Sequence, residues 1–199
     1  PYLGSRNQEP EHKVDVETIF SRFKSYKDLD YVACWFMKGA YYINNTYAKV
    51  AFVSTNSITQ GEQVAEVWKP LFEHYNIQFD FAYRTFVWDS ESTQKAHVHC
   101  VILGFSDKNS QQKVKIIFDE NGEKHVARNI NPYLLDAPTV FIEKRKTPLC
   151  NVSKINKGSQ PTDGGNLIIS AEEYEVFIAK EPAAKKFIRE FIGSEEFIN

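Results

Sequence analysis

The sequence predicts an α/β protein whose sheet ends in an antiparallel hairpin and which continues into a smaller α+β segment. Three observations predict this. Helical and strand-like patterns of apolar residues alternate over the first half of the chain. Two long strand-like runs then follow each other across a short polar turn, as in a closing hairpin. After residue 105 the sequence changes to polar stretches and spaced prolines, which indicates a second, less regular region.

Two helices are expected first. In residues 14–24, Val14, Ile19 and Phe23 recur near one helical face. Residues 29–42 form a longer stretch that is rich in apolar residues on several sides. Both patterns are typical of helices that pack on a sheet.

Strands and a further helix are expected next. A strand-like run at 50–53 is followed by a helical pattern at 63–75. Two runs rich in β-branched and aromatic residues come after it, at 77–88 and 98–105. The polar residues 89–95 between them are the expected turn of a long antiparallel pair.

The second half of the chain carries weaker signals. A hairpin is expected through residues 119–122, and an irregular, proline-punctuated segment follows. Ser170 with Glu173 three residues later forms a capping box that predicts the start of a helix. A second helix is expected from Pro182 to Gly193.

We therefore divide the chain into residues 1–130 and residues 131–199. The boundary is placed where the alternating α/β pattern gives way to the irregular segment.

Composition limits the function. The chain has 199 residues, and a hydrophobic content of 42% is ample for a core. A net charge of −2 argues against a protein that coats DNA non-specifically, because neutralising phosphates rewards a large basic excess. No apolar run approaches the ~20 residues that span a bilayer. Three cysteines without metal-ligand spacing, Cys34, Cys100 and Cys150, suggest the cytoplasm as the compartment.

Seven segments of the chain form a collinear pattern. They are PYLG at 1–4, AKVAFVSTNSI at 48–58, QGEQV at 60–64, FAYRTFVW at 81–88, HCVI at 99–102, PTDGG at 161–165 and FIGSEEFIN at 191–199. The first five resemble, in the same order, the catalytic half of MmeI-like DNA adenine methyltransferases, and the last two look like segments that open the target-recognition domain of the same enzymes. The Ser-Thr-Asn-Ser-Ile and Gln-Gly-Glu-Gln-Val runs are the most distinctive, and the collinear order of all segments carries the resemblance.

The resemblance implies a fold and an activity. Residues 1–130 would be the C-terminal part of a Rossmann-like methyltransferase domain, and residues 131–199 would be a linker and the start of a target-recognition domain. The parent would be a bacterial restriction-modification enzyme that transfers a methyl group from S-adenosylmethionine to adenine N6 in duplex DNA. Most cofactor-binding residues would lie upstream of this chain, so the isolated chain is expected to be inactive.

The resemblance also assigns catalytic residues. The family signature Asn-Pro-Pro-Tyr holds the adenine amine, and Pro1 and Tyr2 look like its last half. Extruding a base from the stack costs a few kcal/mol, which an aromatic sandwich offsets. Tyr2 would be one side of that sandwich. The other side would come from Phe86 first, with Trp88 or Tyr83 next, at about 1 to 3 kcal/mol per stacked base.

Two further groups are predicted contacts. Tyr31 and Trp35 would line the cofactor pocket, as the resemblance implies, although a core position is the plainer interpretation for Trp35. A basic cluster in the second region offers phosphate contacts, with a solvated charged face as the alternative. Its predicted DNA-binding residues are Lys144, Arg145, Lys146 and Lys157.

Two other motifs are interpreted as structural. His97 and His99 lie on one face of a strand without an evident third ligand, so no metal site is predicted. Asn131-Pro132-Tyr133 resembles a shortened catalytic motif but follows no hydrophobic strand, so a turn is expected.

Two other functions stay open. A non-catalytic DNA-binding or specificity module would bind DNA without any partner sequence. A nucleotide-binding Rossmann protein is the weaker option, because it would need a glycine-rich phosphate loop that the sequence does not contain.

Overall fold

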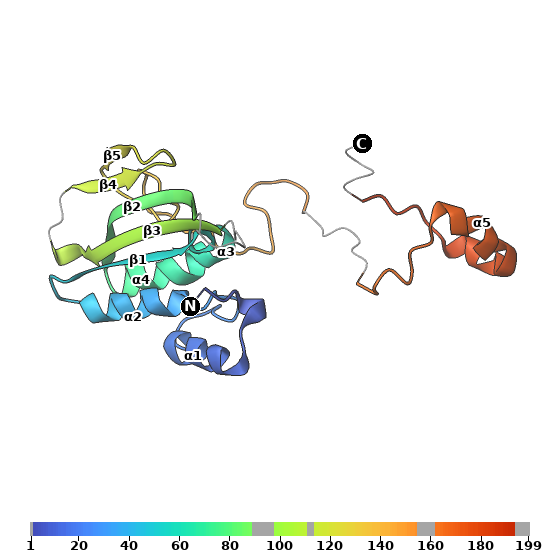
Figure 1. Ribbon diagram of the computed structural model, residues 1–199, viewed down its shortest axis with the longest axis horizontal. Helices are drawn as coiled ribbons and strands as arrows, with labels where there is room; N and C mark the ends of the chain where they lie inside the picture. Colours follow the sequence, from blue (N-terminus) through green and yellow to red (C-terminus); the bar gives the residue numbers. More distant parts are fainter. Residues whose placement is uncertain (1, 89–97, 111–113, 155–161, 194–199) are drawn as a thin grey trace. The chain divides into compact units, whose positions relative to one another are not determined.

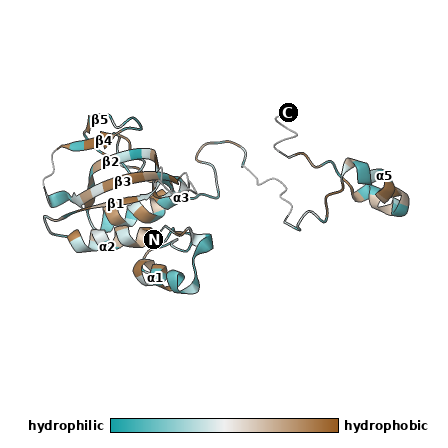
Figure 2. Ribbon diagram, viewed as in Figure 1, coloured by the Kyte–Doolittle hydropathy of each residue, from teal (hydrophilic) through white to brown (hydrophobic). Residues whose placement is uncertain are grey.

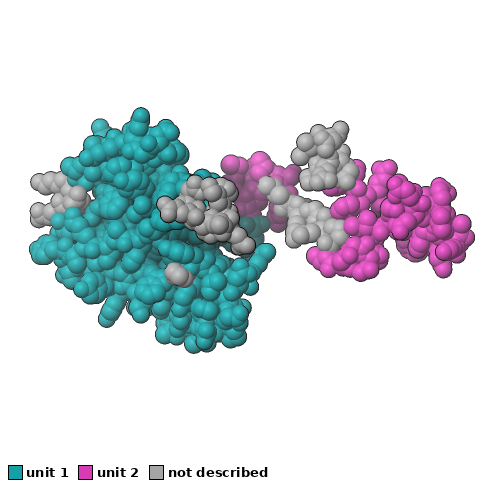
Figure 3. All heavy atoms as spheres, in the orientation of Figure 1, with its two compact units in different colours: residues 1–146 teal, residues 147–199 magenta. Residues whose placement is uncertain are grey.

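The computed structural model describes residues 2–88, 98–110, 114–154 and 162–193. The chain divides into two compact units, unit 1 at residues 1–146 and unit 2 at residues 147–199 (Figures 1 and 3). Each unit is described by itself below. No helix in the described ranges has both the length and the apolar character needed to cross a membrane.

Unit 1 contains a mixed sheet with helices between its first strands (Figure 1). Short 3₁₀ turns lie at Ser5–Asn7, Asn56–Thr59 and Lys108–Ser110, and a π-helical turn lies at Val64–Trp68. The main elements are α1 (Pro10–Phe20), α2 (Ala33–Ile43), β1 (Lys49–Thr55), α3 (Gly61–Gln63), α4 (Lys69–His74), β2 (Ile77–Trp88), β3 (Val98–Asp107), β4 (Lys115–Phe118) and β5 (Lys124–Ala127).

The five strands lie in the order β1-β3-β2-β4-β5. Strand β3 is antiparallel to both β1 and β2, β4 is parallel to β2, and β5 is antiparallel to β4. The predicted α/β architecture and its antiparallel pair of β2 with β3 are confirmed, and so is the hairpin of β4 with β5. Because β1 and β2 both oppose β3, they run in the same direction and their carboxyl ends lie at one end of the sheet.

The predicted helices exist with shifted bounds. The first begins at Pro10 instead of residue 14 and ends at Phe20. Proline suits the first helical position, and the His12 Nδ1 accepts the Glu9 backbone N–H at 3.2 Å, in the place where Glu or Gln ordinarily closes a capping box. The single helix expected at 63–75 is instead α3, the π-helical turn and α4 in succession.

An aromatic cluster joins α2 and the π-helical turn to one face of the sheet. The Phe36 ring lies 5.1 Å from the Trp68 ring and 6.1 Å from the Phe105 ring of β3, centroid to centroid. Trp68 in turn meets Phe79 of β2 edge-on at 4.7 Å. All four side chains are fully buried. Strand β3 carries a long hydrophobic stretch (Figure 2), and its Val101, Leu103 and Phe105 are fully buried, which contributes to the stability of unit 1.

On the opposite face of the sheet, the Phe81 ring of β2 lies close to Gly104 of β3. A Cβ placed there would lie 2.1 Å from Cε1 of Phe81, so only glycine leaves room for that ring. The Phe81 ring therefore lies directly over the β3 backbone.

Unit 2 contains α5 (Ala171–Lys180), which starts as predicted. The Ser170 hydroxyl accepts the Glu173 backbone N–H at 3.3 Å, and the Glu173 carboxylate accepts the Ser170 N–H in return. The helix expected from Pro182 to Gly193 is wrong in type and length, since a 3₁₀ helix ends at Phe187 and Ile188 is extended. None of the described residues of unit 2 is buried.

Candidate active site

The carboxyl ends of β1 and β2 form the candidate site. Thr55 of β1 and Phe86 of β2 both pair with Cys100 of β3, one from each side. Neighbouring strands lie about 4.8 Å apart, so roughly 10 Å separates these two backbones. Open α/β sheets bind ligands beyond the carboxyl ends of their strands. This end of the sheet is therefore the place to look for chemistry.

The first residues of the chain reach the same end of the sheet. The Tyr2 hydroxyl donates to the Val53 carbonyl of β1 at 3.3 Å, and 52% of the Tyr2 side chain is exposed. The structure thus brings Tyr2 and Phe86, two predicted catalytic aromatics, to the same end of the sheet. Pro1 lies outside the described residues.

Strand β2 ends in the other predicted aromatics. Phe86 is half-buried and Trp88 half-exposed, and their rings lie 6.3 Å apart. The register of β2 against β3 shifts between Tyr83 and Phe86, which marks a β-bulge. Bulges of this kind bend a strand and redirect its side chains, and they are common next to active sites.

A hydrogen-bond network fixes the backbone beside Tyr2. The Leu3 carbonyl accepts the Tyr31 N–H at 2.8 Å and the Gln8 side-chain amide at 3.2 Å. The same Gln8 amide nitrogen donates to the Leu29 carbonyl at 2.9 Å. Gln8 is buried, and of its two bonds the one to Leu29 is buried and the one to Leu3 is part-buried.

Asp30 connects that network to β1. Its carboxylate accepts the Ser57 hydroxyl at 2.6 Å, and the hydroxyls of Ser57 and Thr55 lie 2.9 Å apart. Its backbone N–H donates to the Gln63 side chain at 3.3 Å. Thr55, Ser57 and Gln63 come from the two distinctive motifs of the sequence, to which sequence analysis assigned no role. The network explains why these residue types are needed there.

The two predicted cofactor residues differ in their surroundings. The Tyr31 hydroxyl donates to the Asp15 carboxylate at 2.6 Å, and this bond, with burial, raises the pKa of Tyr31 to about 12. The edge of the His12 ring also contacts Tyr31. The Tyr31 hydroxyl thus ties α1 to the start of α2, whereas about half of the Trp35 indole on α2 is exposed.

The predicted phosphate contacts lie at the end of unit 1. Lys144, Arg145 and Lys146 are all exposed, and Lys157 lies outside the described residues. Lys144 is paired with the Glu62 carboxylate of α3 at 3.1 Å. Nearby, Glu143 is paired with Lys69 of α4.

These two ion pairs hold residues 143–144 beside a groove of about 620 Å³. Glu66 lines the groove, and its partial burial, with Asp28 and Glu62 nearby, raises its pKa to about 7. The acidic and basic side chains of the groove are mixed, so its charge selects no particular ligand.

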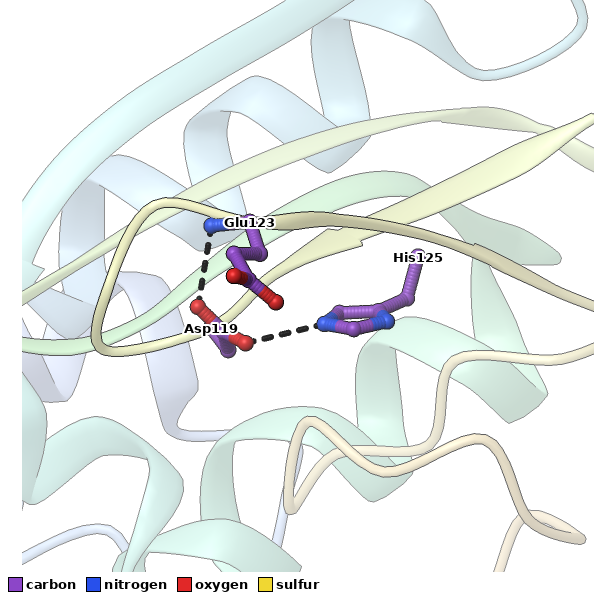
Figure 4. Close-up of side chains that lie close together, drawn as sticks. All are labelled: Asp119, Glu123 and His125. Atoms are coloured by element: carbon purple, nitrogen blue, oxygen red, sulfur yellow. Dashed lines mark hydrogen bonds and ion pairs between the residues drawn. The ribbon is translucent and has the colours of Figure 1, made fainter.

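Asp119 and Glu123, in the turn between β4 and β5, and His125 of β5 lie close enough together to hold a metal ion (Figure 4). The Asp119 carboxylate, however, already accepts backbone N–H groups of Asn121 and Glu123 at 2.9 Å and faces the His125 ring nitrogen at 2.9 Å. These bonds hold the pKa of Asp119 below its usual range, and the bond to His125 has the largest effect. The arrangement is accounted for as a turn that joins the two strands.

Of the two motifs interpreted as structural, the structure tests one. The Asn131 side chain accepts the N–H groups of Tyr133 and Leu135, so the Asn131-Pro132-Tyr133 turn is confirmed. His99 lies on β3 and is exposed, and His97 lies outside the described residues.

The sequence matches two families. Residues 1–119 match the family described as "MmeI, DNA-methyltransferase domain", and residues 136–199 match "MmeI, target recognition domain". The predicted boundary at 130/131 falls between the two matches, whereas the compact units divide after Lys146. The boundary itself stays a prediction.

Relatives and solved structures agree with these matches. DNA methyltransferase A of Bacillus subtilis (strain 168) is 43% identical over the whole chain, which spans 22% of that relative. A solved structure of the Type IIL restriction-modification enzyme MmeI in complex with DNA is 44% identical, with a TM-score of 0.88 over all of this chain and 27% of that one. The chain belongs to the MmeI DNA-methyltransferase family and carries parts of its methyltransferase and target-recognition domains.

Proposed function

We propose that this chain is part of a bacterial, site-specific DNA methyltransferase that transfers a methyl group from S-adenosylmethionine to adenine N6 in duplex DNA. Family membership supports the reaction class. The observation that carries the proposal is the position of Tyr2 and Phe86, which come from distant parts of the sequence to the carboxyl ends of the parallel strands β1 and β2.

The proposed role of this end of the sheet is to hold an extruded adenine. The exposed Tyr2 ring stacks on one side of the base, and Phe86, with Trp88 behind it, lies toward the other. Each such stack contributes about 1 to 3 kcal/mol, which offsets the cost of unpairing the base. Nothing at this end of the sheet would need to act as a strong base or covalent nucleophile, because the amine itself attacks the methyl group.

S-Adenosylmethionine supplies an activated methyl group on a sulfonium. Of the two residues predicted to face it, Trp35 fits better, because its exposed indole offers an apolar surface, whereas the Tyr31 hydroxyl is already bonded to Asp15. Trp35 would thus form an apolar wall of the cofactor pocket.

DNA contacts are proposed at the end of unit 1. Arg145 and Lys146 are the stronger candidates for binding phosphate, because Lys144 would first have to break its ion pair with Glu62. Lys157 is retained as a fourth candidate from its charge alone. These contacts would position the duplex, while bases are read elsewhere in the target-recognition domain. A cytoplasmic location follows from the proposed DNA substrate.

The test is methyl transfer by the full-length enzyme that carries this sequence. Labelled S-adenosylmethionine and unmethylated plasmid DNA are expected to give label on adenine N6. Replacing Tyr2 by Ala is expected to lower the rate about 5- to 150-fold, the range that corresponds to 1 to 3 kcal/mol. The matched control is Tyr47→Ala, which removes a more exposed tyrosine that precedes the amino end of β1.

Other outcomes would reject the proposal in different ways. Label on cytosine would overturn the adenine assignment while leaving a methyltransferase. No label, with salt-dependent binding of the plasmid, would favour a non-catalytic specificity module.

A further inference from the structure

Gln8 contributes an unusual pair of hydrogen bonds beside the candidate site. Its side-chain nitrogen donates to the carbonyls of Leu3 and Leu29, at 3.2 and 2.9 Å, and only 7% of the residue is exposed. An amide NH₂ has two N–H donors, and here each meets a different carbonyl. Gln8 therefore joins the segment that carries Tyr2 to the loop that precedes α2.

The bond from Gln8 is one of two hydrogen bonds that the Leu3 carbonyl oxygen accepts. The Leu3 carbonyl also accepts the Tyr31 N–H at 2.8 Å, so both acceptor positions of this oxygen are used. With two donors from different parts of the fold, the peptide that follows Leu3 cannot rotate without breaking a hydrogen bond. The adjacent Tyr2 makes a longer bond, from its hydroxyl to the Val53 carbonyl at 3.3 Å.

We propose that Gln8 is a positioning residue for methyl transfer, which fixes the Leu3 peptide so that the Tyr2 ring is presented to the extruded base. Gln8 does not touch the base. Its effect passes through Tyr2 and falls on the capture and orientation of the base rather than on the binding of DNA or cofactor. This inference rests on the function proposed above.

A purely structural role makes different predictions. If Gln8 only stabilised the fold, its loss would lower the melting temperature and act equally on all activities. If it positions Tyr2, its loss would lower the rate of the chemical step with little change in DNA affinity, and only while Tyr2 is present. Misplacement of a reacting group by about 1 Å can cost on the order of 100-fold in rate.

The test uses the full-length enzyme and two substitutions. Gln8→Met keeps the size of the side chain and removes both donors. Gln8→Glu keeps its shape, but the ionised carboxylate has no donor and faces two carbonyls, whereas the neutral acid regains one O–H donor. The matched control is Thr18→Val on α1, which removes another bond from a side chain to a backbone carbonyl, at 2.8 Å.

Single-turnover methyl transfer into unmethylated plasmid DNA, DNA affinity and melting temperature are measured for each variant. Thr18→Val is expected to match the unaltered enzyme. Gln8→Met is expected to lose about 10- to 100-fold in rate with DNA affinity within about twofold. The rate of Gln8→Glu, relative to the unaltered enzyme at each pH, is expected to rise as pH falls.

A double substitution tests whether the effect of Gln8 on the rate passes through Tyr2. In a Tyr2→Ala background, Gln8→Met is expected to lower the rate no further, since residues that act through one another are not additive. Additive losses, an unchanged rate for Gln8→Met, or failure of both Gln8 variants to fold would each overturn the positioning role. An unaltered enzyme that transfers no methyl group would instead overturn the proposed function, and this inference with it.

Discussion

The two units differ in how they use their apolar residues. Unit 1 packs aromatic side chains from α2, the π-helical turn and the sheet into one fully buried cluster, Phe36, Trp68, Phe79 and Phe105. Unit 2 also contains large apolar residues, but those described, such as Leu167, Phe187 and Ile192, are exposed. Its helix α5 buries none of its residues, and a capping box closes its first turn.

This difference indicates which features of the two units local sequence signals are sufficient to predict. Local signals place the start of α5 correctly, but a helix of ten residues gains little stability from local interactions alone. In unit 1, packing between distant segments stabilises the elements and brings the candidate catalytic residues together. Four experiments can challenge or refine this contrast.

The largest effect is expected in the core of unit 1. Phe79→Ala should lower the free energy of unfolding by about 3 to 5 kcal/mol, since it leaves a cavity beside Trp68 and Phe72. Phe187→Ala in unit 2 removes a ring of which 74% is exposed and should change stability by less than about 0.5 kcal/mol. Urea unfolding of both variants measures the difference. Equal losses would mean that unit 2 has a core of its own.

A smaller effect is expected where the sheet strands approach closely. Gly104→Ala should cost about 1 to 3 kcal/mol, because the new methyl group overlaps the Phe81 ring. Combining it with Phe81→Leu should recover part of that loss, since leucine is smaller than the ring. Thermal unfolding checks both variants. If the double variant lost more stability than the two single variants lose together, the proposed overlap would be the wrong explanation.

The cap of α5 should have a local effect. Ser170→Ala removes the acceptor for the Glu173 N–H and should destabilise the helix by about 1 kcal/mol. Hydrogen exchange should become faster in α5, while the unfolding of unit 1 stays unchanged. Ser153→Ala, at an exposed position, is the control. Slower exchange, or a loss of stability in unit 1, would contradict a purely local role for the cap.

The smallest effect is a pH dependence at Glu66. Its pKa is raised from 4.5 to about 7 in the folded protein, chiefly by burial. Between these values the folded state binds more protons than the unfolded state, so stability should fall as pH rises through this interval and level off above it. Glu66→Gln should remove this part of the pH dependence. Melting temperatures at pH 5 and pH 8 measure it, and an identical pH profile in the variant would disprove the assignment.

Sequence patterns predicted the strands well, because alternating and aromatic-rich runs at 77–88 and 98–105 have few other structural solutions. They also predicted the turn at Asn131 and the cap at Ser170, which depend on residues at most four positions apart. The start of α1 was missed because a histidine, instead of Glu or Gln, accepts the bond at its first turn.

The supporting residues of the candidate site could not be predicted in this way. Gln8 reaches Leu29 and Asp30 reaches Ser57 across more than twenty residues of sequence, and a lone glutamine or aspartate carries no periodic signal. The roles of Tyr2 and Phe86 were suggested by resemblance alone. Their common position depends on the strand order, which places β3 between β1 and β2.

The pairing of β4 with β5 has a practical consequence for exchanging recognition domains between relatives. The match to the methyltransferase family ends at residue 119, inside the turn of the β4–β5 hairpin. A chimera joined there would pair β4 of one parent with β5 of the other, and would replace the buried Ile130 and Leu134. A junction after Lys146 keeps the whole first unit from a single parent.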